Sequence, residues 1–310
     1  MKIEALEGVF PDEWIDIQFP LETDDNPTNG KELIGFSVPY LDKGFVQLID
    51  YMGDDRSISE GARASFRGAA YDDDEKNRGL INYLVRHQHT SPVELPVLQF
   101  RTKIPLFVRA QHIRHRTQSC NWESHRYSEV RPEFYVPPLE RIRLQDEWNK
   151  QGSGEQLESE VRAEVREAFI NRHTEQVGTY QGVIERGVSR ETARGIMSTS
   201  FYTTGVWSMK LRNLFHYLKL RTDPHAQAET QLFAGIVEQF TAKLFPMAYE
   251  AWKEFEKGAT SFSEEEMEIL TRYLSAADFK RWFHEHEMRD EDKLGGSKGR
   301  VREFLEKVSR

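Results

Sequence analysis

Residues 98–104 most constrain the fold of this chain, because Leu98, Phe100, Thr102 and Ile104 alternate there with Gln99, Arg101 and Lys103. A period of two predicts a strand with one buried face. The neighbouring residues carry helical patterns instead. An acidic run at 72–75 opens a pattern that should end before Pro92, and Pro105 suits the first position of a helix that we expect to continue to Arg116. A strand between two helices indicates a chain that mixes both kinds of element.

The rest of the sequence adds mainly helix. We expect short strands or irregular chain over 1–60, a long loop over 117–138 and a flexible surface connection over 151–154. Helices are expected over 155–186, 189–197, 206–221 and 226–256, the last bent at Pro246, and after a capping box at 263–266. The sequence therefore predicts an α+β fold, mainly helical with a small mixed or antiparallel sheet.

Composition excludes several classes of protein. The chain has 310 residues, enough to bury a large core, and no run approaches the roughly 20 apolar residues of a membrane-spanning helix. Its first residues lack the basic and apolar regions of a signal peptide. A single cysteine, Cys120, fits a reducing compartment, and the net charge of −9 argues against sequence-independent nucleic-acid binding. We therefore expect a soluble cytoplasmic protein that binds neither membrane nor nucleic acid.

Charge is nevertheless concentrated in one stretch. Residues 101–131 contain seven arginines and lysines against two glutamates, a local charge of +5. Guanidinium groups bind phosphates and carboxylates through paired hydrogen bonds, so the stretch suits an anionic ligand. A solvated basic face paired with acids elsewhere is the alternative.

The sequence has few signals of a catalytic nucleophile or of a metal site. The sequence has no Gly-x-Ser-x-Gly turn, no Gly-x-Gly-x-x-Gly and no phosphate-binding loop that ends in Gly-Lys-Ser/Thr. Cys120 could be an activated thiolate, but a packed or loop cysteine is the more ordinary interpretation. Five histidines lie between His87 and His125, yet their spacing matches no zinc template. We predict no metal.

The densest group of hydrogen-bonding side chains lies at 111–126. If the preceding helix continues to Arg116, then Gln111, Arg114 and His115 share one of its faces. Such a face is costly to bury without a partner. The donors that follow suit a ligand with phosphates and a heteroaromatic ring.

This segment resembles the signature of the flavin-dependent thymidylate synthases, Arg-His-Arg-x-x-Ser-x-Asn-Glu-x-Ser-x-Arg. The matching residues are Arg114, His115, Arg116, Ser119, Asn121, Ser124 and Arg126. The resemblance covers roughly residues 60–256. It includes Ala-Arg-Ala-Ser-Phe at 62–66, His-Gln-His-Thr-Ser-Pro-Val-Glu at 87–94, Arg-Glu-Thr-Ala-Arg at 190–194 and Leu-Arg-Thr-Asp-Pro-His-Ala-Gln at 220–227.

The resemblance implies roles for individual residues. Deoxyuridine monophosphate (dUMP) would be bound by Gln111, Arg114, Glu123, Ser124, His125, Arg126, Arg194 and Arg221. Flavin adenine dinucleotide (FAD) would be contacted by Ser65, Ser91, Glu94, Arg114, His115, Arg116, Asn121, Lys210, Arg212, His216 and His225. Arg221 would be catalytic, because its charge favours ionisation of the uracil ring at N3. Alternatively, Arg221 only caps the C-terminus of a helix.

The positions of Arg212 and Arg221 also imply shared sites. Nine residues separate them, so their side chains point to opposite sides of one helix. A homotetramer with sites shared between subunits, as the resemblance implies, explains that geometry. The resemblance further implies an N-terminal extension at 1–60, a catalytic domain at 61–256 and a helical C-terminal extension at 257–310.

Several positions depart from the family pattern. Trp122 replaces the signature glutamate, with Glu123 one place later. Lys210 and His216 replace two asparagines, and Met197-Ser198 replaces a Leu-Pro pair. Trp122 could stack on a ligand ring or pack within the protein. Lys210 and His216 would add charge or proton-transfer capacity near the flavin.

The implied activity is reductive methylation of dUMP, with methylenetetrahydrofolate, FAD and NADPH as the other small molecules. A flavin carries the redox chemistry in this scheme, so no enzyme nucleophile is needed. Two alternatives stay open: hydroxymethylation of a uracil or cytosine nucleotide on the same fold, and a nucleotide- or flavin-binding protein without turnover.

Overall fold

In a computed structural model of the chain, residues 2–19, 30–127, 129 and 132–273 are described. The chain separates into two compact units, Met1–Gly258 and Ala259–Arg310. The domain boundaries drawn from the sequence at residues 60 and 256 stay a prediction.

A five-stranded antiparallel sheet forms the centre of the first unit, in the order β1-β2-β3-β7-β4. Its strands are β1 (Ser37–Tyr40), β2 (Gly44–Met52), β3 (Val97–Pro105), β4 (Ser119–Trp122) and β7 (Tyr202–Lys210). The alternation at 98–104 lies within β3, where every apolar position from Leu98 to Ile104 is buried. The strand predicted there is confirmed. A separate hairpin joins β5 (Arg143–Gln145) and β6 (Ser153–Gln156).

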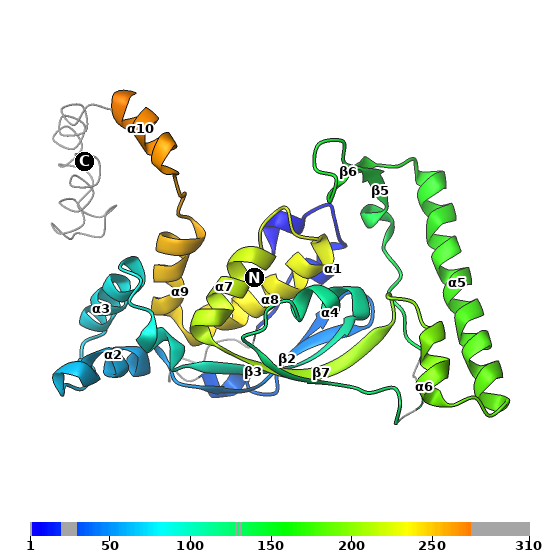
Figure 1. Cartoon of the computed structure of the whole chain (residues 1–310), viewed down its shortest axis with the longest axis horizontal. Coiled ribbons are helices and arrows are strands. Elements are labelled where there is room, and N and C mark those ends of the chain that lie inside the picture. Colours follow the sequence, from blue (N-terminus) through cyan, green and yellow to red (C-terminus); the bar gives the residue numbers. More distant parts are fainter. Residues whose placement is uncertain (1, 20–29, 128, 130–131, 274–310) are drawn as a thin grey trace. The chain divides into compact units, whose positions relative to one another are not determined.

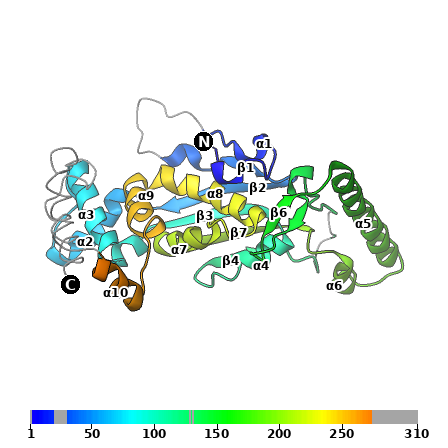
Figure 2. The same ribbon diagram turned by 90° about the horizontal axis from the view of Figure 1, so that it is seen from above.

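Helices α7 and α8 cover one face of this sheet (Figure 1). Helix α8 (Ala228–Leu244) is buried along nearly its whole length, and α7 (Leu211–Arg221) buries a stripe that includes Leu214 and Leu218. Seen from above, α5 and α6 lie beyond one end of the strands and α2 and α3 beyond the other (Figure 2). The core thus lies between the sheet and α7–α8.

The remaining helices of the first unit are mostly short. They are α1 (Asp12–Ile15), α2 (Asp55–Arg63), α3 (Asp74–Arg86), α4 (Leu106–His112), α5 (Ser159–Glu185), α6 (Arg190–Ala193) and α9 (Pro246–Trp252). The 3-10 turns are η1 (Glu4–Leu6), η2 (Gly30–Leu33), η3 (Ala64–Phe66), η4 (Ser91–Glu94), η5 (Leu139–Arg141) and η6 (Arg194–Ile196), and a π-helical turn, η7 (Lys253–Lys257), follows α9. About half of the described residues are helical, and the α+β prediction is confirmed.

In three places a prediction is wrong because strand pairing overrides the local pattern. The helix expected over 206–221 begins only at Leu211, since 202–210 form β7 between β3 and β4. The loop expected over 117–138 contains β4, an edge strand that exposes most of its side chains and so shows no alternation. The connection expected at 151–154 turns into β6 of the hairpin.

The long helices are confirmed, although α5 begins at Ser159 instead of residue 155, because residues up to Gln156 belong to β6. Asp73 accepts backbone hydrogen bonds from Glu75 (3.0 Å) and Lys76 (3.3 Å) at the start of α3. Helix α5 ends before Gly187, whose φ of +84° is the left-handed conformation that favours glycine. Pro246 interrupts the helical run and begins α9, as predicted.

The second unit is described as far as residue 273. It holds α10 (Glu264–Tyr273), and its predicted capping box is formed: the backbone of Ser263 donates to the Glu266 carboxylate (2.7 Å) and the backbone of Glu266 donates to the Ser263 hydroxyl (3.2 Å). The part of the C-terminal extension after 273 lies outside the described residues. None of the helices described combines the length and apolarity needed to span a bilayer.

Candidate active site

Helix α4 ends at His112, four residues earlier than predicted. The carbonyl of His112 accepts hydrogen bonds from the Gln118 side chain (3.0 Å) and the His115 backbone (3.2 Å), which closes the end of the helix. Arg114 and His115 therefore lie in the turns after α4, and the prediction that they share a helical face with Gln111 is wrong. Arg114 is exposed, whereas His115 turns inward and is only 9% exposed.

Arg221, the predicted catalytic residue, contacts His115 from the last position of α7. Its Nε donates to Nε2 of His115 (3.0 Å), and its Nη2 lies 3.4 Å from the backbone carbonyl of Gln111. The Tyr217 ring packs edge-on against His115, with centroids 4.7 Å apart. Two segments far apart in the sequence thus meet at one guanidinium.

His115 is a neutral acceptor at neutral pH. Burial, followed by the nearby charges of Arg221 and His216, lowers its pKa to about 4. The unprotonated Nε2 can then accept the Arg221 hydrogen bond, while Nδ1 carries the ring proton. No carboxylate of the described residues pairs with Arg221, so its charge stays available to a ligand.

The side chain of Gln111 is held by the start of α8. Its Nε2 donates to Oε1 of Gln227, and its Oε1 accepts from the Thr230 hydroxyl (3.0 Å). We call Gln111, His115, Arg221, Gln227 and Thr230 the Arg221 cluster.

A second group of predicted residues follows β4. Asn121 on this strand pairs with Val206 of β7, and the next residue, Trp122, lies over Gly205 so closely that a β-carbon there would come within 2.3 Å of its ring. Trp122 also lies under the Arg109 guanidinium, 5.1 Å from its ring centroid. Trp122 therefore packs within this chain, the second of the two roles considered for it.

The segment Glu123–Arg126 leads away from the sheet. Glu123 is exposed and donates its backbone N–H to the Thr204 carbonyl (2.8 Å), and Ser124 is half-buried. The His125 ring stacks edge-on against Phe201 at 4.9 Å, and neither of its buried ring nitrogens has a hydrogen-bond partner in the described part of the chain. Burial is the main cause that lowers the His125 pKa.

Arg126 and Arg194 present their guanidinium groups to solvent. Arg126 lies over the exposed ring of Tyr127, 5.3 Å from the centroid, and Arg194 belongs to the turn η6. A surface cavity of about 490 Å³ opens beside Arg126 and the turn between α5 and α6. Within the described residues, neither arginine has a carboxylate partner. We call Asn121, Glu123, Ser124, His125, Arg126 and Arg194 the exposed arginine group.

A third group gathers at η3, η4 and the start of α7. Ser65 and Ser91 are exposed on the two turns. Lys210 forms an exposed ion pair with Glu94 (3.5 Å), and Arg212 pairs with Glu256 (2.8 Å). These predicted flavin contacts thus fall into two acid–base pairs and two exposed hydroxyls.

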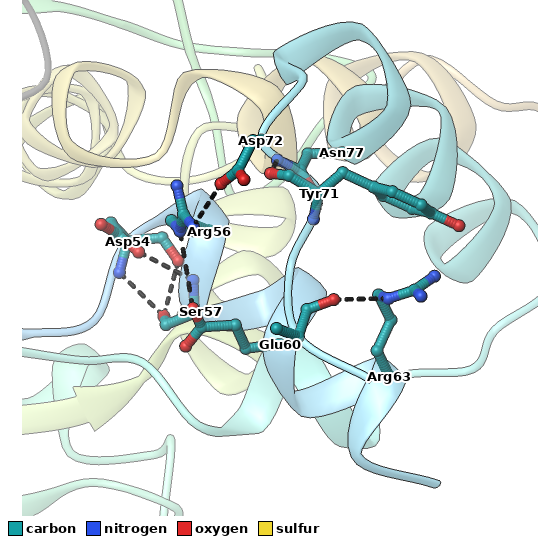
Figure 3. Close-up of polar contacts among 9 residues, drawn as sticks. Asp54, Arg56, Ser57, Glu60, Arg63, Tyr71, Asp72 and Asn77 are labelled. Carbon is teal, nitrogen blue, oxygen red and sulfur yellow. Dashed lines mark hydrogen bonds and ion pairs between the residues drawn. The ribbon is translucent and has the colours of Figure 1, made fainter. Parts of the chain in front are cut away.

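The chain that joins the turn with Ser65 to α3 is held by polar contacts from α2 and α3 (Figure 3). Arg56 reaches Asp72 (3.0 Å), and the Asn77 side chain bonds both backbone groups of Tyr71 (2.8 and 3.1 Å). Arg63, just before the turn, donates to a backbone carbonyl and lies 4.1 Å from the centroid of the Tyr71 ring. The α2–α3 connection is therefore well ordered by its own contacts.

The other predicted flavin residues are exposed. They include Arg116, His216 on α7 and His225, whose Nδ1 lies 2.9 Å from the Asp223 carboxylate. Among the described residues, no group of three metal-ligating side chains occurs.

The residues that hold the predicted site residues in place were not predicted from the sequence. Gln227 and Thr230 hold Gln111, Tyr217 packs on His115, and Glu256 pairs with Arg212. Only Gln227 gave a signal, since it ends the His-Ala-Gln segment. The other three are ordinary helical residues, whose partners depend on tertiary packing.

Comparison with known proteins identifies the family. The family model described as thymidylate synthase complementing protein matches residues 47–247. A flavin-dependent thymidylate synthase of Thermus thermophilus is 39% identical over 88% of this chain and 96% of its own length, and one of Wolbachia pipientis is 38% identical over 78% and 84%.

A solved structure agrees with this match. The UMP/dUMP methylase PolB of Streptomyces cacaoi, bound with 5-Br UMP, superposes with a TM-score of 0.64 at 31% identity, over 71% of this chain and 99% of PolB. A methylase and two synthases do not favour the hydroxymethylase alternative. The chain belongs to the flavin-dependent thymidylate synthase family.

Proposed function

We propose that this protein is an enzyme that methylates dUMP reductively at C5 of the uracil ring. The one-carbon unit would come from methylenetetrahydrofolate, and NADPH would be the reductant. Similarity to two flavin-dependent thymidylate synthases and to PolB, a UMP/dUMP methylase, supports this reaction. The contacts and the exposure of this chain's own residues support it as well.

The observation that carries the proposal is the environment of Arg221. Its guanidinium has five N–H groups, and the two bonded within the protein donate to neutral acceptors, the imidazole of His115 and the carbonyl of Gln111. A positive group that is half-buried and has no neutralising acid among the described residues can stabilise negative charge that develops on a ligand. We propose that this ligand is the uracil ring and that Arg221 favours the ring ionised at N3.

The exposed arginine group suits the nucleotide's phosphate. Arg126 and Arg194 offer forked donors without a carboxylate partner in the described chain, and Arg114 is a third exposed guanidinium. Ser124, His125 and Glu123 would complete the contacts to dUMP together with Gln111. His125 fits this role because its two buried ring nitrogens lack partners among the described residues.

The predicted FAD contacts fit that cofactor in chemistry. FAD carries two phosphates and two ring systems, and the set provides the exposed cation Arg116 and the polar side chains of Asn121, Ser65 and Ser91. Glu94, Arg114, His115, Lys210, Arg212, His216 and His225 would complete the set. When bound, the flavin would supply the hydride that reduces the transferred carbon unit to a methyl group.

The separation of these groups on one chain supports sites shared between subunits. Arg212 and Arg221 lie nine residues apart on α7, a rise of roughly 14 Å, and contact different partners. We propose a homotetramer, in which each site combines groups from different chains. A cytoplasmic location and the domain boundaries at 60 and 256 accompany this proposal as expectations.

The experiment that tests the function is a product assay of the purified full chain. Incubation with FAD, dUMP, methylenetetrahydrofolate and NADPH should give a nucleotide whose mass is larger by one CH2 unit, because a methyl group replaces a hydrogen atom. Protein that takes up no FAD, or a product that carries a hydroxymethyl group, would contradict the proposal.

The Arg221→Ala variant tests whether Arg221 has the proposed catalytic role. Loss of a positioned cationic donor should lower turnover by about 10²- to 10³-fold. The affinity for dUMP, measured by titration calorimetry, separates catalysis from binding. Normal turnover in the variant would remove Arg221 from the mechanism.

A further inference from the structure

Thr230 is a buried polar residue whose hydroxyl points at a predicted nucleotide contact. Its side chain has no solvent exposure, and its Oγ1 donates to Oε1 of Gln111 across 3.0 Å. Thr230 is the third residue of α8, so it contacts Gln111 of α4 from a different element. A valine would fill the same space but offer no donor.

The Gln111 amide is only half satisfied by the described part of the protein. A primary amide has two N–H donors and an oxygen with two lone pairs. Gln227 takes one N–H, and Thr230 occupies one lone pair. One donor and one acceptor remain, and Gln111 is partly exposed. The amide can therefore bind a ligand through a defined donor and a defined acceptor, provided that its orientation is fixed.

The start of α8 is firmly anchored, which makes it a suitable support for that orientation. Glu229 is 3% exposed, and its carboxylate accepts from Tyr135 (3.1 Å) and from Arg141 at two atoms (2.9 and 3.3 Å). Its backbone carbonyl accepts from the buried hydroxyl of Tyr40 (2.8 Å). Thr230, the next residue, is held in place by these contacts.

We infer that Thr230 is a positioning residue for nucleotide binding: its hydroxyl, together with Gln227, orients the Gln111 amide toward dUMP. This inference rests on the proposed function. Arg221 bonds the Gln111 backbone, which does not depend on how the side-chain amide is turned. Loss of the Thr230 hydroxyl should thus weaken substrate binding and leave the chemical step almost unchanged.

The test compares Thr230→Val with Thr230→Ser in the full-length FAD-loaded protein. Titration with dUMP should show about 3- to 10-fold weaker binding for T230V, the size expected for one hydrogen bond, and near wild-type binding for T230S. The KM for dUMP should rise by a similar factor in T230V, with kcat within about twofold of wild type. Either of two results would overturn the inference. One is a fall of kcat in T230V as large as the rise of its KM, and the other is an equal rise of KM in T230V and T230S.

Thr241→Val is the matched control on the same helix. Thr241 is also fully buried, but its hydroxyl donates to Val237 within α8 (2.8 Å). T241V should keep wild-type affinity for dUMP, and weakening equal to that of T230V would show a general effect of helix α8. If T230V does not fold, Thr230→Ala removes the same hydroxyl and carries the same expectation.

The outcomes separate the inference from the proposed function. Wild-type protein that fails to bind dUMP refutes the proposed function and this inference with it. Wild-type protein that binds dUMP, with T230V and T230S equally tight, refutes the role of Thr230 alone.

Discussion

The Arg221 cluster and the exposed arginine group differ in how far a single chain completes them. In the first, Arg221, His115 and Gln111 are hydrogen-bonded to one another and to α8. In the second, Arg126 and Arg194 are exposed, and no acid of the described residues pairs with them. The side chains of the Arg221 cluster are held by contacts within the protein. The guanidinium groups of the exposed arginine group have no acidic partner among the described residues to hold them, and a bound anion would fix their positions.

This difference follows from burial. The side chains of the Arg221 cluster are buried or half-buried, so a polar atom there that lacks a partner incurs a larger desolvation cost than an exposed one. Exposed guanidinium groups are satisfied by water and lose little if they stay unpaired. We therefore expect mutations in the support of the first region to affect stability, and mutations in the second to affect binding alone.

Arg141→Met should have the largest effect on the first region. It removes the partner of the buried Glu229 carboxylate and leaves an uncompensated charge at the start of α8. Breaking a buried pair in this way lowers the free energy of unfolding by about 3–5 kcal/mol. Urea unfolding of both proteins at pH 7 measures the difference.

Arg172→Met provides the control for Arg141→Met. Arg172 pairs with Glu175 on the surface of α5 (2.6 Å), and both side chains are 65% exposed. Its loss should not shift the urea midpoint measurably. Equal midpoint shifts in the two variants would show that burial does not distinguish these pairs.

Arg126→Ala should affect the second region in the opposite way. Its guanidinium contacts only the neighbouring Tyr127 in the described structure, so the urea midpoint should not change. Affinity for dUMP should fall by about 10- to 100-fold, because a hydrogen bond between charged groups is lost. Calorimetric titration at two salt concentrations tests this, since screening should reduce the wild-type advantage.

Arg126→Lys sharpens the same comparison. Lysine keeps the charge but not the forked donor geometry, so it should restore part of the affinity. Tight binding of dUMP by Arg126→Ala would exclude this arginine from the phosphate site.

The fold could be predicted from sequence where one local signal dominated. The alternation in β3, the Asp73 cap of α3 and Pro246 before α9 each determine their element through nearby residues. Strand β7 could not be predicted in this way. No turn residue stands between its last apolar residue, Met209, and the start of α7, and only pairing with β3 and β4 separates strand from helix at Lys210.

The same distinction between local signals and tertiary packing applies to the site. The signature residues could be named from their order in the sequence, and the family that they indicate is confirmed. The residues that support them could not be predicted, because Thr230 and Glu256 reach Gln111 and Arg212 only after α4, α7 and α8 pack together. The early end of α4 is another example, since it depends on the Gln118 amide, six residues beyond His112.

The most gradual expected effect is the contribution of His115 to the free energy of unfolding as a function of pH. Its pKa is about 4 in the folded chain and about 6.5 when unfolded, so the unfolded chain binds more protons between these values. The stabilising effect of a neutral His115 is therefore fully present above pH 6.5 and lost as the pH falls toward 4. The slope from one such group is at most about 1.4 kcal/mol per pH unit.

His115→Gln isolates this contribution, because glutamine keeps an acceptor for Arg221 but does not titrate. Buried His112, with a pKa of about 3, adds a slope of the same sign, and Asp55, raised to about 6 by burial, adds one of opposite sign between 3.8 and 6. Both remain in the variant, so the difference between the wild-type and variant unfolding curves reports His115 together with its electrostatic effect on His112. Leu220→Gln, on the exposed side of α7, removes no titrating group and should keep the wild-type slope. Parallel curves for wild type and His115→Gln would mean that His115 does not act as the neutral partner of Arg221, and the first region would then resemble the second.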